Sequence, residues 1–88
     1  MRFEVAEEGA VAHLEYRLYK GDIALMHTEV PAVLEGKGVA SALVRYAFAY
    51  AAEHRLPVMV YCPYVAAFVQ RHPEYQAQVD NKYTRPSL

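Results

Sequence analysis

Several features that mark particular protein classes are scarce or missing in this chain of 88 residues. It has one cysteine, which excludes an internal disulfide and a multi-cysteine metal site and fits a reducing compartment. It has no apolar run of the roughly 20 residues that a membrane-spanning helix needs, and Met1 to Glu4 do not begin a signal peptide. No set of histidines and carboxylates has metal-ligand spacing. We therefore expect a cytoplasmic protein that binds neither a metal nor a membrane.

An excess of charge of one sign is also missing. The formal net charge is −1, and acidic and basic residues are scattered along the chain instead of forming a basic stripe. Phosphate backbones bind such stripes, so nucleic acid is not an expected partner. The chain is instead 55% hydrophobic and holds eight tyrosines, which is the composition of a folded globule. Its length allows one domain, which we expect at residues 1–79, followed by a polar tail at residues 80–88, in a monomer or a homodimer.

The first third of the chain has the patterns of strands. Between Val11 and Tyr19, apolar and polar residues alternate with a period of two, which is typical of a strand with one solvated face. Gly21-Asp22 is a hairpin signal, because glycine supplies the positive φ that such turns need. A short strand is expected before it, at Arg2–Ala6, and a more apolar one after it, at Ile23–Val30. This order predicts an antiparallel meander of three strands.

The rest of the chain predicts a helix, a strand and a second helix. Apolar residues with a period of about 3.6, free of internal proline and glycine, predict a long helix at Gly38–Arg55. The wholly apolar segment Val58–Tyr61 predicts a buried strand, and Pro63 suits the first turn of a helix that ends before Pro73. So short a connection between two strands implies a right-handed crossover, and hence a fourth strand nearly parallel to the third. The predicted fold class is mixed α/β (α+β).

The segment Glu35-Gly36-Lys37-Gly38-Val39-Ala40 opens the long helix and is the strongest candidate for a binding site. Glycines before a helix let an anion approach the main chain, and the first turn offers unpaired N–H donors with a partial positive charge. A diphosphate can accept hydrogen bonds from these N–H groups and is attracted by the partial positive charge. The alternative is that the two glycines only turn a strand into a helix.

The wider sequence around these glycines resembles the acyl-CoA-binding motif of the GNAT acyltransferase superfamily. That motif is Gln/Arg-x-x-Gly-x-Gly/Ala, followed by an amphipathic helix. Gly38 and Ala40 match its glycine and its glycine-or-alanine, whereas Glu35 stands where glutamine or arginine is usual. Residues 27–31 before it, and residues 62–65 together with 71–75 after it, resemble the small stand-alone branch of this superfamily.

The resemblance implies a GNAT-like fold with acetyl-CoA or CoA as its ligand. The diphosphate would lie at the glycine turn and the pantetheine along the fourth strand. The expected cofactor-binding residues are Glu35, Gly36, Lys37, Gly38, Val39, Ala40, Val58, Val60, Tyr61 and Tyr64. The branch lacks the elements that bind the acceptor in larger relatives, so the acceptor stays open.

Two side chains are candidates for the chemistry. Cys62 follows a buried strand and precedes a helix, whose N-terminus favours the thiolate. It is either a nucleophile, a proton donor to the departing CoA thiolate, or a packing residue. His27 ends the third strand and is either the general base or a partner of its neighbours. His13 and His54 are expected to be solvated surface residues.

The sequence therefore favours an acetyl-CoA-dependent N-acyltransferase that transfers an acetyl group to an amine of unknown identity. The alternative is a CoA-binding regulatory module with little or no catalysis. A third hypothesis, a protein-interaction domain that uses a tyrosine-rich surface, predicts no CoA binding.

Overall fold

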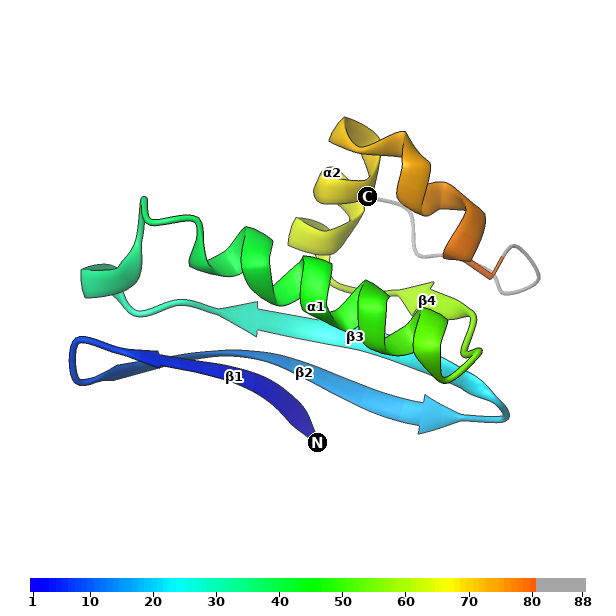
Figure 1. Cartoon of the computed structure of the whole chain (residues 1–88), viewed down its shortest axis with the longest axis horizontal. Helices are drawn as coiled ribbons and strands as arrows, with labels where there is room; N and C mark the ends of the chain where they lie inside the picture. The colour runs from blue at the N-terminus through cyan, green and yellow to red at the C-terminus, as the bar shows by residue number, and fades with distance from the viewer. Residues whose placement is uncertain (81–88) are drawn as a thin grey trace.

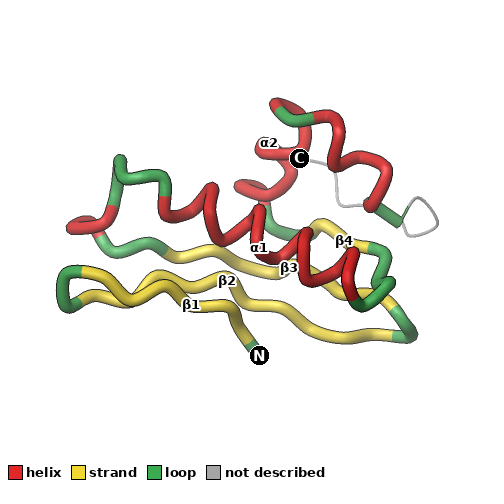
Figure 2. The backbone as a smooth tube through the Cα atoms, in the orientation of Figure 1, coloured by secondary structure: helices red, strands yellow, loops and turns green. Residues whose placement is uncertain are grey.

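The computed structural model describes residues 1–80, so residues 81–88 of the expected polar tail lie outside the described residues. Figure 1 shows the elements in chain order, and Figure 2 shows the same backbone coloured by secondary structure. They are β1 (Arg2–Glu7), β2 (Ala10–Tyr19), β3 (Asp22–Glu29), the 3₁₀ turn η1 (Ala32–Leu34), α1 (Val39–Glu53), β4 (Val58–Val60), α2 (Pro63–Arg71) and the 3₁₀ turn η2 (Pro73–Gln78). The order of strands and α-helices is the predicted one, whereas both 3₁₀ turns were not predicted.

The four strands form one sheet in the order β1-β2-β3-β4. β1, β2 and β3 pair antiparallel and β4 joins β3 in parallel, which confirms the mixed fold expected from the sequence. The second hairpin turn is one residue earlier than predicted. Lys20 and Gly21 have positive φ angles of 49° and 86°, and Asp22 already belongs to β3. Two successive positive φ angles are typical of the turns whose twist matches that of a hairpin.

A bulge in β3 reverses the side-chain alternation halfway along the strand. Leu25 pairs with Tyr16 and His27 pairs with Glu15, so Met26 has no partner in β2. An extra residue of this kind changes which face the following side chains occupy. Beyond the bulge it is therefore Thr28 that shares a face with the core.

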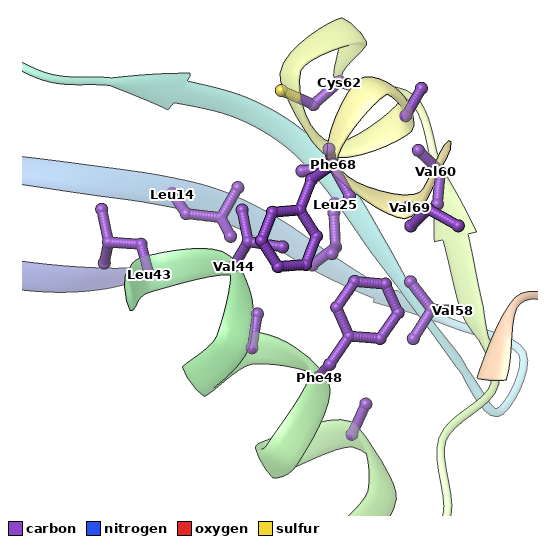
Figure 3. Packing of buried hydrophobic residues seen from close by; sticks show 14 of the residues in the cluster. Leu14, Leu25, Leu43, Val44, Phe48, Val58, Val60, Cys62, Phe68 and Val69 are labelled. Carbon is purple, nitrogen blue, oxygen red and sulfur yellow. The ribbon is translucent and has the colours of Figure 1, made fainter. Parts of the chain in front are cut away.

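Both helices pack on the same face of the sheet. Figure 1 shows α1 lying across that face with α2 beside it. The core between them and the sheet holds Leu14, Leu25, Val44, Phe48, Val58 and Phe68, which Figure 3 shows in close contact. Phe48 and Phe68 are 0% exposed, and burial of such a side chain contributes roughly 1.5–3 kcal/mol. The predicted apolar stripe of the long helix is thus the face that packs on the sheet.

The chain after α2 folds back over α1 and covers the outer edge of β4. The ring of Tyr75 in η2 lies 5.0 Å from that of Phe48. Val79 forms a parallel bridge with Val58, and the N–H of Asp80 donates to the Val58 carbonyl at 2.8 Å. Within residues 1–80, no helix is both long enough and apolar enough to cross a membrane.

Candidate functional site

The glycine turn places an uncapped helix N-terminus beside the end of β3. Gly36 and Gly38 have positive φ angles of 78° and 76°, whereas Lys37 between them has a negative φ. Alternating backbone conformations of this kind can turn successive N–H groups toward one side, as in known anion-binding concavities. Gly38 is the N-cap of α1 and provides no capping side chain, and the first turn of α1 holds no acidic residue. The N-cap side chain therefore does not satisfy the first N–H groups of α1.

A cleft of about 520 Å³ opens at this turn. Its walls come from the end of β3, the η1 segment, the turn, the first residues of α1 and the start of α2. The lining residues are Thr28, Val30, Leu34, Glu35, Gly36, Gly38, Val39, Ala40, Ser41 and Tyr64. Six of the ten predicted cofactor-binding residues are among them: Glu35, Gly36, Gly38, Val39, Ala40 and Tyr64. The structure thus brings together segments that are 36 residues apart in sequence, Thr28 to Tyr64.

The other four predicted cofactor-binding residues do not line this cleft. Lys37 forms an ion pair with Glu8 in the β1–β2 hairpin, with both side chains about half exposed. The side chains of Val58 and Val60 are 0% and 2% exposed and belong to the core. Tyr61 is half-buried and directly follows β4. A ligand in the cleft is therefore out of reach of the valine side chains.

Cys62 lies directly behind the wall of the cleft. Its Sγ is 3.4 Å from Oγ1 of Thr28, which lines the cleft. The residue is the N-cap of α2 and only 3% exposed, and Figure 3 shows its sulfur at the edge of the core. Its N–H and that of Tyr61 both donate to the Leu25 carbonyl, at 3.1 and 3.0 Å. These bonds fix the thiol at the point where β3 and β4 separate.

His27 lies on the opposite face of the sheet from Cys62. The bulge at Met26 turns its side chain to the helix-free face, where it is 58% exposed and 3.4 Å from Oε1 of Glu29. The structure therefore does not bring the two candidate catalytic residues together on one face. They flank the end of β3 from its two sides.

The expectation for His13 was wrong. Its side chain is only 14% exposed, with its ring 6.4 Å from that of His27 and its Nε2 3.8 Å from Oε1 of Glu15. It pairs with Glu4 of β1 and with Glu29 of β3, so its ring lies between side chains of both neighbouring strands. His54, in contrast, is half exposed as predicted. Among the described residues, no three histidine, cysteine or acidic side chains are placed to hold a metal ion.

Thr28, Val30 and Ser41 line the cleft but were not among the predicted site residues. Uninterrupted alternation from Ile23 and Leu25 would place His27, not Thr28, on the cleft side. The bulge reverses this, and nothing in the sequence marks its position. Ser41 could have been predicted from the sequence, since the third helical residue after a glycine N-cap lies in the first turn.

Comparisons with known proteins point to one family. A family model described as GCN5-related N-acetyl-transferase matches residues 2–79. Protein NATD1 of Bos taurus is 34% identical over 73 residues, covering 83% of this chain and 64% of that protein. The Xenopus tropicalis and Danio rerio proteins of the same name are 32% and 31% identical, over 66% and 73% of their lengths. The chain thus spans about two thirds of the cattle and frog proteins.

Proposed function

The chain belongs to the GCN5-related N-acetyltransferase family, and we propose that it transfers an acetyl group from acetyl-CoA to an amine. The observation that carries the proposal is the cleft at the start of α1. It joins a glycine-rich, uncapped helix N-terminus to the end of β3, with a thiol behind its wall. This combination suits acetyl-CoA, whose diphosphate would bind at the helix N-terminus and whose thioester would lie near the thiol.

The diphosphate of CoA is proposed to bind at Gly36–Val39 through main-chain N–H groups. Charge-assisted hydrogen bonds contribute roughly 1.5–3 kcal/mol each, more than the roughly 0.3–1 kcal/mol of an exposed helix dipole. Glu35 lines the same cleft but is exposed at the end of η1. We propose that its carboxylate points to solvent, because it has the same sign as the phosphates.

The pantetheine arm is proposed to run from the turn past Tyr64 to Thr28. The pairing of β3 with β4 ends at Leu25 and Val60, so Met26–Glu29 run past the end of β4. That free edge is better placed than β4 itself, since the Val58 and Val60 side chains are in the core. The N–H groups of Tyr61 and Cys62, which follow β4, already donate to the Leu25 carbonyl.

The transfer step requires two proton movements on opposite sides of the thioester. The amine nitrogen forms a bond to the acetyl carbon, the carbon–sulfur bond breaks, and CoA leaves as a thiolate. His27, on the open face, takes the proton that the amine loses. Cys62, behind Thr28, gives its proton to the CoA sulfur, and the two residues return to their starting states through solvent.

The burial of Cys62 favours the role of proton donor over that of nucleophile. Accepting an acetyl group adds three heavy atoms at Sγ, where the residue is 3% exposed and packed within the core. Donating a proton needs no added volume. We expect Cys62→Ala to lower kcat while the Kd for CoA stays within about twofold. Mass spectrometry of the wild type incubated with acetyl-CoA should show no acetyl adduct at Cys62, and a stable adduct there would overturn this role.

Two measurements test the proposal as a whole. CoA should raise the melting temperature in a concentration-dependent way, because a ligand that binds only the folded state stabilises it. Release of free CoA thiol from acetyl-CoA, followed across a panel of amines, should exceed the rate without amine. No thermal shift would remove the proposal entirely.

A second candidate function is CoA binding without efficient transfer. It is favoured by the separation of Cys62 from His27 on opposite faces of the sheet, and by the burial of Cys62. A clear thermal shift with CoA together with no amine-dependent thiol release would support this function over the first.

A further inference from the structure

We propose that the acceptor binds on the helix-free face of the sheet and is an amine that also carries a carboxylate, as an amino acid does. This inference rests on the acetyl transfer proposed above and adds the class of its acceptor. It starts from a hollow of about 260 Å³ on that face. The hollow is lined by Met1, Arg2, Glu15, Tyr16, Arg17 and Met26.

The helix-free face leaves the end of β3 open to an acceptor. On the other face the cleft proposed to hold CoA lies at Thr28, and Cys62 behind it is 3% exposed. On the helix-free face, His27 is 58% exposed. A thioester at the free edge of β3 can therefore be attacked from that side.

The bulge in β3 joins the hollow to His27. Met26, the bulged residue, lines the hollow, and His27 follows it in the chain. Glu15 pairs with His27 across the ladder and also lines the hollow. Directly paired side chains of antiparallel strands are about 4.5–5.5 Å apart at Cβ. An amine held by Glu15 is therefore next to the imidazole that is proposed to take its proton.

The hollow has separate positive and negative ends. Arg17 lines it and has no ion-pair or hydrogen-bond partner among residues 1–80, whereas Arg2 is bound to Glu4 at 2.7 Å. Glu15 lies two residues from Arg17 on the same face of β2, a separation of about 7 Å along a strand. An unpaired guanidinium is suited to a carboxylate, which it can bind through two parallel hydrogen bonds.

A zwitterion matches this pattern better than a diamine. Its carboxylate would bind Arg17, and its ammonium would bind Glu15. The ammonium loses one proton to solvent, and the resulting amine passes a second proton to His27 as it attacks the thioester. Glu29, 3.4 Å from Nε2 of His27, holds the ring and is a positioning residue. A diamine would satisfy Glu15 but would place its second cation beside Arg17.

Matched pairs of acceptors test the inference directly. Leucine and 3-methylbutylamine differ only in the carboxylate, as do lysine and 1,5-diaminopentane. In each pair kcat/KM with acetyl-CoA should be at least about tenfold higher for the amino acid, the scale of one charge-assisted bond. Arg17→Gln should remove that difference by raising KM for the amino acid while leaving the decarboxylated partner unchanged. Lys20→Gln, which removes one positive charge at the neighbouring hairpin, should leave the difference intact.

Two further readouts separate this inference from the proposed function. Calorimetry with CoA should give the same Kd for Arg17→Gln and the wild type, and no binding by the wild type would refute the proposed function itself. If CoA binds but turnover is undetectable, leucine titrated into the CoA complex should shift the NMR amide signals of Glu15, Arg17 and Met26. Equal kcat/KM within each pair, a preference for the diamine, or no such amide shifts would overturn the inference alone.

Discussion

The two ends of α1 each border a hollow of similar size, yet their chemistry differs. The hollow at the start of the helix measures about 520 Å³ and the one at its end about 450 Å³. At the C-terminal end, Arg55 adopts a positive φ of 56°, its N–H donates to Ala52, and the N–H of Leu56 donates to Ala51 at 2.8 Å. These bonds satisfy the last carbonyls of the helix. At the N-terminal end, Gly38 provides no capping side chain.

The comparison teaches that the volume of a hollow does not identify a binding site. The C-terminal end of α1 is closed by its own main chain, and its hollow is lined largely by alanine, leucine, proline and valine. The N-terminal end leaves N–H donors open at a turn of two glycines. Unsatisfied polar groups, and not size, distinguish the end proposed to bind CoA.

The largest change in CoA affinity is expected when a side chain is added at the N-terminal end of α1. Gly38→Ala should raise the Kd for CoA at least about tenfold, because the added methyl group blocks the anion at a position that lines the cleft. Calorimetric titration with CoA measures this change.

Gly9→Ala is the matched control for Gly38→Ala. Both glycines have a φ of 76°, and at neither position would a Cβ meet another atom of the chain within 4 Å. Both variants should therefore lose a similar stability, about 1–2 kcal/mol for a left-handed residue. Equal CoA affinity in the two variants would contradict the assignment of the cleft.

A smaller effect is expected at the pair formed by Lys37 and Glu8. Exposed charge interactions contribute about 0.2–1 kcal/mol, so Lys37→Gln should weaken CoA binding by up to about fivefold. Glu8→Gln should strengthen it by a similar factor, since Glu8 competes with phosphate for Lys37. The double variant should bind no more tightly than Lys37→Gln. If Glu8→Gln still strengthened CoA binding in the double variant, its effect would not be exerted through Lys37.

The smallest effect is expected at the C-terminal end of α1, which its own main chain closes. Arg55→Gly should raise the free energy of unfolding by roughly 0.5–1 kcal/mol, because glycine adopts the positive φ without strain. It should leave the Kd for CoA unchanged. Urea unfolding measures the first and calorimetry the second, and a weaker CoA affinity would contradict the separation of the two ends.

Most of the fold was predictable because its signals are local. The alternation in β2 and the helical stripe of α1 each specify an element and the face that it buries. The glycine turn was also predictable, since glycines such as Gly36 and Gly38 adopt positive φ angles without strain. The bulge at Met26 was not, because it is decided by the pairing of β2 with β3 and by no single residue.

The rest of the candidate site depends on that bulge and on contacts distant in sequence. The bulge decides that Thr28 lines the cleft while His27 faces the other side. The packing of η2 against Phe48 and the bridge between Val79 and Val58 are likewise set by tertiary contacts. Segment patterns therefore predicted the glycine turn that borders the cleft, but not which β3 side chains line the cleft.

The most direct test compares CoA, 3′-dephospho-CoA and pantetheine by calorimetry on the wild type. The account predicts that the two molecules that carry the diphosphate bind with similar Kd, and that pantetheine binds at least about a hundredfold more weakly, as expected from losing two charge-assisted bonds. Gly38→Ala should lose most of this advantage. Equal binding of CoA and pantetheine would contradict the claim that the open end of α1 holds a diphosphate.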